Sequence, residues 1–370
     1  MNSENLGIAD LWMVKLTRTL LSIGLALAAV ISPVACTPQQ RTQQTTSQTQ
    51  QDSPWQEVGQ LPTPLESHQM LMLGDFVYVI GGWNETKGIH EDVFFTSLMS
   101  DGTFGDWQET TAQLPLKLQH HMVTIHESAI YVFGGDNGFW DGSEVTRRIL
   151  RAVPNDEGDI MEWTDVGELP EPLTIHAVTS LDNQIYIVGG SNTFRPDNTT
   201  VIDKIFTATI AADGTVGDFQ ELAPFPTPIG WVTATTVDNR IFAVSGTAQF
   251  RPSQLLDQVW VADIQPDKTL STFEPVGTIT ARQRHATVLV DRTLVAIAGG
   301  AANKVLATVE AAEVDTTGNI GPWTELPPLP ETRYAHAAFV HDGHIYVSGG
   351  FINYGSTETS TKIYRYQETF

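Results

Sequence analysis

Five arginines occupy related positions in an otherwise acidic chain, and their chemistry is that of anion binding. Two stand in matching triplets, Phe194-Arg195-Pro196 and Phe250-Arg251-Pro252, and three precede histidines in Arg282-Gln-Arg284-His285 and Arg333-Tyr-Ala-His336. A guanidinium stays charged and binds a carboxylate through two parallel hydrogen bonds. These arginines are therefore candidate ligands for an anionic small molecule or for acidic side chains. Alternatively, some of them form salt bridges between repeats with Glu331, Asp197 or Asp257.

The charge of the whole chain limits its partners. The 370 residues include 20 Lys and Arg against 43 Asp and Glu, which gives a net charge of −23. A surface this acidic repels nucleic acids and anionic lipid headgroups, so we expect no nucleic-acid partner. Any anion that binds needs a local cluster of base. We expect a monomer without a cofactor.

Five histidines recur at one position of a repeated segment, and a sixth copy carries Val232 instead. A ring of histidines could suggest a metal site, but no His-x-x-x-His pair or adjacent carboxylate ligand set accompanies them. We interpret them as structural side chains that satisfy backbone groups, and we expect no metal. They are His68, His121, His176, His285 and His336.

Amides and aromatic side chains follow the glycine pairs of the same segments. Trp83, Trp140, Asn192 and Asn353 are the candidate ligand-binding residues among them. Aromatic rings beside amides and charges suit sugar or peptide contacts. Asparagine also tolerates tight turns, so loop structure is the alternative explanation for the amides.

The elements that position these residues are repeated six times. Five diglycines and the degenerate Val244-Ser245-Gly246 recur every 50 to 56 residues, and an aromatic residue leads each copy in phase. In the third copy, short alternating or β-branched segments predict four strands. Their ranges are 174–181, 184–188, 201–210 and 216–222. The lead aromatics are Trp55, Trp107, Trp163, Phe219, Phe273 and Trp323.

This pattern resembles the kelch repeat, whose period is about 50 residues. The resemblance covers residues 55–370 and implies an all-β, six-bladed propeller with four antiparallel strands in each blade. The last copy lacks a fourth strand, so we expect the strand at Trp55 to complete it and close the ring. Ligands of kelch proteins commonly bind on the face that carries the loops after the diglycines. The five arginines map to this top face.

The first 53 residues do not belong to the repeats. Residues 1–36 have a basic flank, an apolar stretch and small residues, the layout of a secretory signal, with Met1 or Met13 as the start. Cys36, the only cysteine, follows Ala35 as in a bacterial lipoprotein processing site, although Pro33 departs from that pattern. Alternatives are an uncleaved signal anchor and a secreted protein. Residues 37–53 are polar and predict a flexible linker, so we expect an extracytoplasmic, lipid-anchored propeller.

Two classes of function remain open. The first is a binding module that uses the arginine- and aromatic-bearing top face to hold a protein or an anionic carbohydrate. The second is an enzyme that resembles the sialic acid mutarotase, with Glu66, Glu331 or a top-face histidine as general acid and base. Copper oxidase chemistry of the galactose oxidase type is excluded, because it needs a cysteine near the metal and Cys36 lies in the leader.

Overall fold

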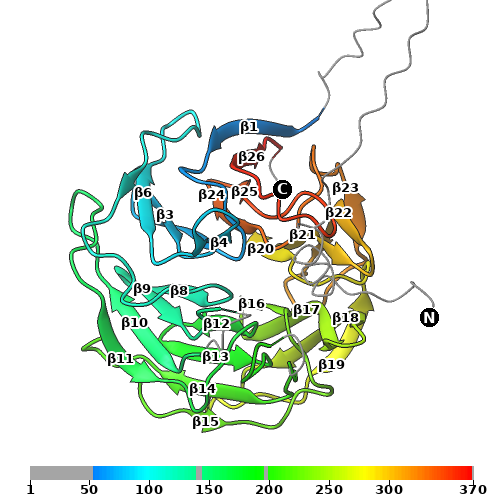
Figure 1. Cartoon of the computed structure of the whole chain (residues 1–370). Coiled ribbons are helices and arrows are strands. Elements are labelled where there is room, and N and C mark those ends of the chain that lie inside the picture. Colours follow the sequence, from blue (N-terminus) through cyan, green and yellow to red (C-terminus); the bar gives the residue numbers. More distant parts are fainter. Residues whose placement is uncertain (1–52, 139–143, 196–198, 369–370) are drawn as a thin grey trace, which may run out of the picture. The chain divides into compact units, whose positions relative to one another are not determined.

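A computed structural model describes residues 53–138, 144–195 and 199–368, and its strands form six antiparallel sheets arranged as blades around a ring (Figure 1). Residues 54–370 form one compact unit. The described residues contain no helix, and therefore none that is long and apolar enough to cross a membrane. The predicted leader and linker, residues 1–53, lie outside the described residues except for Ser53.

Each blade takes its strands in chain order from the axis outward. Blade 1 contains β2 (Gln69–Leu73), β3 (Phe76–Ile80), β6 (Val93–Ser97) and β7 (Gln108–Glu109). Blade 2 contains β8 (Met122–His126), β9 (Ala129–Phe133), β10 (Arg148–Ala152) and β11 (Thr164–Glu168). Blade 3 contains β12 (Ala177–Leu181), β13 (Gln184–Val188), β14 (Ile205–Thr209) and β15 (Gln220–Glu221).

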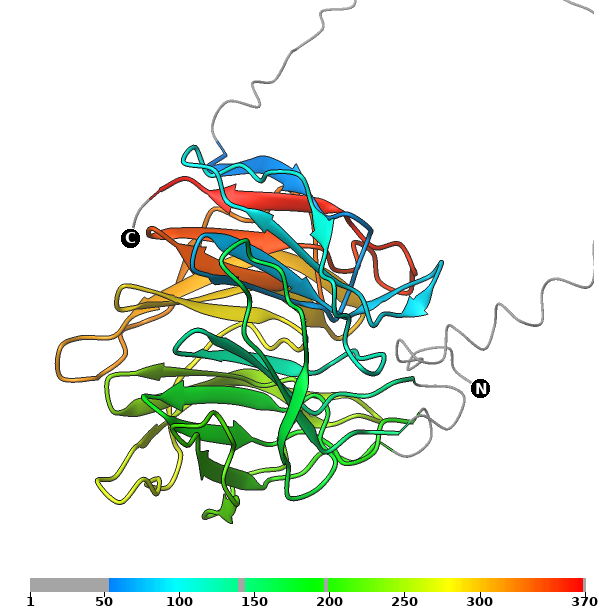
Figure 2. The same ribbon diagram turned by 90° about the vertical axis from the view of Figure 1, so that its left-hand side faces the viewer.

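The second half of the chain repeats this order until the last blade. Blade 4 contains β16 (Thr233–Val237), β17 (Arg240–Gln249), β18 (Gln254–Asp263) and β19 (Glu274–Thr278). Blade 5 contains β20 (Ala286–Val290), β21 (Thr293–Ala301), β22 (Lys304–Glu313) and β23 (Thr324–Leu326). Blade 6 contains β24 (Ala337–His341), β25 (His344–Ser348), β26 (Lys362–Tyr366) and β1 (Trp55–Gln60). A short hairpin of β4 (Trp83–Asn84) and β5 (Gly88–Ile89) projects from blade 1 (Figure 2).

The hydrophobic core lies between neighbouring blades. The second strands are the most buried, and every residue of β9 and β13 is inaccessible to solvent or nearly so. Their β-branched and aromatic side chains pack against the next blade, as Tyr78 of blade 1 does in one cluster with Ile130 and Val132 of blade 2. This packing between sheets supplies the apolar burial that a single four-stranded blade cannot provide.

The diglycines allow this close approach. Gly134 has a φ of +56°, and a Cβ atom placed on it would lie 2.3 Å from the carbonyl oxygen of Leu173 in the loop that leads into blade 3. In the degenerate copy, Ser245 adopts the same left-handed conformation. Its hydroxyl accepts a hydrogen bond from the Arg282 N–H at 3.0 Å, and its single proton lies within reach of the carbonyl oxygens of Leu256 and Arg282, 2.7 and 2.8 Å away. These contacts support the non-glycine residue at this position.

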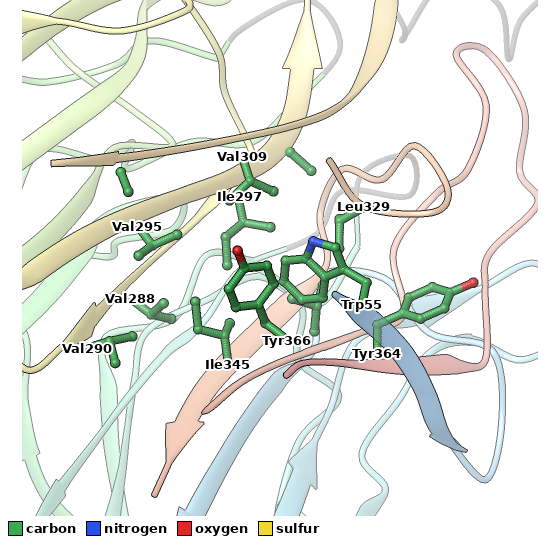
Figure 3. Packing of buried hydrophobic residues seen from close by; sticks show 13 residues of the cluster. Trp55, Val288, Val290, Val295, Ile297, Val309, Leu329, Ile345, Tyr364 and Tyr366 are labelled. Atoms are coloured by element: carbon green, nitrogen blue, oxygen red, sulfur yellow. The ribbon is translucent and has the colours of Figure 1, made fainter. Parts of the chain in front are cut away.

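The predicted ring closure is confirmed. β1 pairs antiparallel with β26, and Trp55 lies opposite Tyr366, their ring centroids 5.0 Å apart. Both rings pack against blade 5 beside Val295 and Ile297 (Figure 3). The Trp55 indole N–H also donates to the carbonyl oxygen of Pro327, 2.9 Å away. The strand from the beginning of the propeller therefore completes the blade at its end.

All four predicted strands of blade 3 are present, but three are shorter than the predicted segments, β12 and β14 by three and five residues, and the outer strand is the shortest. β13 has the predicted bounds, whereas β15 contains only Gln220 and Glu221 of the predicted segment 216–222. Both residues are exposed and pair with one neighbour only, on β14. An outer strand without a second partner keeps fewer ladder hydrogen bonds.

Candidate functional site

The motif histidines are structural. Four of them are buried at the start of the innermost strands, where burial lowers their pKa values to about 3. His68 Nε2 lies 3.0 Å from the Ser348 hydroxyl of the preceding blade, and His285 Nε2 lies 3.2 Å from the Thr233 hydroxyl. His68 and His285 thus contact side-chain hydroxyls of an adjacent blade, where the sequence led us to expect backbone groups. In the part of the chain that the structure describes, no three His, Cys, Asp or Glu side chains gather as a metal site would require.

Arg282 and Arg333 also serve the interior, which corrects the expectation that all five arginines share an accessible face. Both side chains are 0% exposed. Arg282 forms an ion pair with Glu310 and donates to the carbonyl oxygen of Ala298 at 2.9 Å. Arg333 donates to the Gly349 carbonyl, and its guanidinium lies 3.6 Å from the carboxylate of Glu331. Glu331 is one of the three salt-bridge partners that the sequence suggested. A guanidinium enclosed by its own blades cannot reach a ligand, so we leave both out of the site.

The residues directly before the five motif histidines, and before Val232 in the fourth copy, form a circle that is here called the axial ring. One residue from each blade belongs to it, and each has a φ between 48° and 56°. Backbone hydrogen bonds of 2.7 to 3.4 Å connect neighbouring members at five of the six junctions. Six consecutive blades can approach one another this closely only around the propeller axis. The axial ring consists of Ser67, His120, Ile175, Trp231, Arg284 and Ala335.

Arg284 is the cation of the axial ring. Its guanidinium carbon lies 4.4 Å from the centre of the Trp231 ring and 5.9 Å from that of Tyr334. The side chain is half-buried, and it forms no hydrogen bond or ion pair with any described residue. Aromatic faces hold a guanidinium in place without using its N–H donors. Arg284 can therefore offer these donors to an anion at the top of the axis.

An aromatic cluster connects Arg284 to two other predicted arginines. Trp231 lies 5.9 Å from Phe194 and 5.4 Å from Phe250, measured between ring centroids. Arg251 is exposed, and its guanidinium carbon lies 5.8 Å from the centre of the Phe250 ring. Arg195 is exposed directly after Phe194. Three of the five predicted arginines are therefore in or next to one largely buried aromatic cluster contributed by blades 3 and 4.

A second row of aromatic rings approaches Arg284 from the other side. Tyr334 stacks on Phe351 with centroids 5.0 Å apart, and Phe351 lies 5.9 Å from Trp83 of the β4–β5 hairpin. The predicted ligand residue Trp83 thus joins the same site. Burial raises the pKa of Tyr334, so its hydroxyl stays protonated as a possible donor.

Two buried carboxyl groups support residues of the axial ring. Asp136 is 0% exposed and accepts hydrogen bonds from Gln119 Nε2 and Thr174 Oγ1, both 2.8 Å away, while His120 Nδ1 lies 2.9 Å from it. Glu66 accepts a hydrogen bond from the Ser67 hydroxyl. Burial raises the pKa of Glu66, and the charges of Arg284 and His120 oppose that shift. Glu66 and Asp136 thus hold the axial-ring residues Ser67 and His120, while Asp136, like Arg282 and Arg333, is fully enclosed.

The remaining predicted site residues are not drawn into this cluster. Asn192 is exposed, and its amide lies 3.2 Å from the Glu171 carboxylate; Asn353 is exposed in the loop after β25. Trp140 and Cys36 lie outside the described residues. Sequence reasoning missed His120, Asp136 and Trp231. Aligning the six copies at the position before the motif histidine would have identified two of them.

Six phased blades around one closed axial ring define a six-bladed β-propeller with an arginine and aromatic rings at its top centre. A profile of the KLHDC2/KLHL20/DRC7 Kelch-repeats domain matches residues 161–350, just over half of the chain. The chain belongs to the kelch-repeat family.

Known proteins share parts of this sequence or its fold. Beta-scruin of Limulus polyphemus is 28% identical over 198 residues, which cover 52% of this chain and 20% of that protein. Alpha-scruin of the same organism is 26% identical over 273 residues, 72% of this chain and 28% of that protein. The chain thus matches about a quarter of the length of these relatives. The solved structure of YjhT shares the fold, with a TM-score of 0.64, 12% identity, and coverage of 83% of this chain and 95% of that chain.

Proposed function

We propose that this kelch propeller is a binding module that holds a carboxylate of a protein partner at the top of its axis. Arg284 carries the proposal, because it is held over Trp231 and Tyr334 with its donors unused by any described residue. Kelch propellers commonly bind other proteins, which supports a protein partner. Arg195 and Arg251 stand beside the same aromatic cluster and would attract acidic segments to it. Aromatic walls reduce the competition of water for the guanidinium.

The test is calorimetric titration with an acidic peptide, acetyl-Glu-Asp-Glu-amide, and with N-acetylneuraminic acid. Arg284→Ala is expected to weaken binding by about 10-fold or more, since a charge-assisted hydrogen bond contributes about 1.5–3 kcal/mol. Arg147→Ala, which removes an exposed arginine of blade 2 paired with Glu168, is the matched control and should bind as the wild type does. Equal affinities of the wild type and the folded Arg284→Ala variant would reject the proposal.

The second candidate function is that of a sugar mutarotase, favoured by the acid and base groups beside Arg284. Ring opening of an anionic sugar requires a general acid and a general base. Glu66, whose pKa is raised by burial, and the His120–Asp136 pair could take these roles. Saturation-transfer NMR with N-acetylneuraminic acid separates the two functions. An enzyme accelerates anomer exchange and loses this acceleration in Glu66→Gln, whereas a binding module does not accelerate it in either form.

We further propose that the propeller is extracytoplasmic and tethered through lipid on Cys36. Support comes from the leader-like residues 1–36 and the polar spacer 37–53. A lipid attached to the thiol would hold the domain at a membrane surface without a spanning helix. The top face would then remain available to a partner in the cell envelope.

A further inference from the structure

Neighbouring blades are fastened at the bottom face, which carries the turns between third and fourth strands. At five junctions a side chain of one blade donates to a carbonyl oxygen in that turn of the next blade. The distances range from 2.6 Å for Arg365 to 3.2 Å for Tyr186. The five bonds are Tyr78 to Gly158, Tyr131 to Gly214, Tyr186 to Lys268, Arg240 to Gly318 and Arg365 to Asp101.

The same turns insert an apolar side chain into the preceding blade. In each case this residue stands three positions before the lead aromatic of the outer strand. Val216 of blade 3, for example, packs against Tyr131 and Ile149 of blade 2, and Ile320 of blade 5 packs against Phe242 of blade 4. The five inserted residues are Phe104, Ile160, Val216, Leu270 and Ile320.

Among the residues that the structure describes, the junction from blade 5 to blade 6 lacks both features. Blade 6 takes its third strand, β26, and its outer strand, β1, from opposite ends of the propeller, so no turn connects them. The residue three positions before Trp55 is Asp52, which is not apolar. On blade 5, Val295 and Ala311 stand where blade 2 has Tyr131 and Arg151, as their strand pairing shows. Neither side chain can donate a hydrogen bond.

A hollow of about 510 Å³ opens at this place on blade 5. Its lining includes Thr293, Ala311, Ala312 and Leu326. Three of these, Thr293, Ala311 and Leu326, correspond by strand register to Ala129, Arg151 and Gly167 of blade 2, where the turn of blade 3 is seated. The volume lies within the range of about 300–1,000 Å³ that ligand sites occupy.

The rim of the hollow is acidic. Glu313 and Asp315 line it, and both are exposed. Among the described residues, neither carboxylate of the rim forms an ion pair. The nearby Arg292 donates to the carboxylate of Asp238 at 2.8 Å and to the main-chain oxygens of Val314 and Asp315, and its charge also attracts Glu313 and Asp315. A basic group on an incoming segment would therefore be favoured here.

We propose that this hollow is a docking site for a turn of a partner protein that presents a branched or aromatic apolar side chain beside a lysine or arginine. The five occupied junctions define the shape of that turn, and the acidic rim defines its charge. The site lies on the face opposite the axial ring, so it does not depend on the proposed anion binding. Binding through both faces would let the propeller connect two partner proteins.

The chain itself supplies a probe. The acetylated peptide Pro-Asp-Lys-Thr-Leu-Ser-Thr-Phe copies residues 266–273, with Lys268 next to the turn that inserts Leu270. The peptide is titrated into the full chain, labelled at its alanine methyl groups, and NMR spectra are recorded. We expect it to shift the Ala311 and Ala312 methyl signals in a saturable manner. A peptide with Leu→Asp and Lys→Glu at these two positions should not shift them. Failure of the first peptide, or equal shifts by both, would overturn the proposal.

Two variants of the chain complete the test. Ala311→Arg introduces the residue that blades 2 and 6 have at this position, Arg151 and Arg365, and should fill the hollow and weaken binding at least 10-fold. Ala211→Arg, in an exposed turn of blade 3, is the matched control and should bind normally. If Ala311→Arg does not fold, Glu313→Lys tests the rim instead, and its affinity for the peptide should fall to the same extent. A last control asks whether the chain fills its own hollow. If deletion of residues 369–370 or 37–52 shifts the Ala312 methyl signal in the absence of peptide, the chain does so, and the proposal is overturned.

Discussion

At the scale of single residues, position within the repeat decides what an arginine does. Arg282 and Arg284 are two residues apart, yet the first points between blades to Glu310 and the second lies at the axis over Trp231. Burial lowers the pKa of Arg282 to about 10, which still leaves it charged at neutral pH. A charged side chain is stable in the interior only when an oppositely charged partner lies beside it. Arg282 therefore contributes to the junction of blades and Arg284 to the candidate site.

The buried histidines make stability depend on pH, and His176 tests this. Burial lowers its pKa to about 3, below the ordinary value of 6.5, so between these values the unfolded chain binds more protons than the folded chain. The stabilisation by the neutral ring is complete above pH 6.5 and is lost as the pH falls toward 3. His176→Gln should reduce the loss of unfolding free energy between pH 7 and 5 by about 2 kcal/mol. Urea unfolding at both pH values measures it, and an unchanged loss would contradict the prediction.

At the scale of elements, the strands depend on neighbours that are distant in sequence. β1 contributes six residues to a blade whose other strands begin at Ala337. Trp55 is 4% exposed because blades 5 and 6 cover it together. The outer strands of the other blades follow their third strands directly along the chain. Blade 6 is thus the blade whose formation requires the two ends of the propeller to meet.

Removing β1 should therefore destabilise the propeller far more than shortening the spacer. Deletion of residues 54–60 exposes the edge of β26 and the faces that Trp55 covers, and the loss of a buried tryptophan alone costs about 3–5 kcal/mol. Deletion of residues 37–51 should leave the thermal midpoint unchanged. Differential scanning calorimetry compares the two forms. Equal midpoints for the two deletions would show that β1 does not close the ring.

At the scale of the whole molecule, the two faces of the propeller differ in chemistry. The top centre carries Arg284 and its aromatic neighbours, and the bottom of blade 5 carries a hollow with an acidic rim. A net charge of −23 keeps such a protein soluble and makes local positive charge selective for anions. The proposed lipid tether would leave both faces available to partners.

The proposed tether predicts where the protein is found. In bacteria that express the full chain, radiolabelled palmitate should be incorporated and the protein should sediment with membranes. Cys36→Ala should abolish the label and release the propeller into the soluble fraction, because the anchor would be the acyl chains rather than a spanning helix. Cys36→Ala protein that keeps its membrane association would contradict lipid anchoring and favour the uncleaved signal anchor.

The amino-acid sequence by itself determined the number of blades, the kelch fold and the closure at Trp55, because diglycines and lead aromatics recur at one phase along the chain. It also located the structural histidines, whose position is repeated in the same way. The tertiary structure alone decided which arginines face solvent, because side chains at related positions point either between blades or toward the axis. It also brought Glu66, His120, Trp231 and Tyr334 to one axis, since residues more than 50 positions apart become neighbours only when the ring is closed.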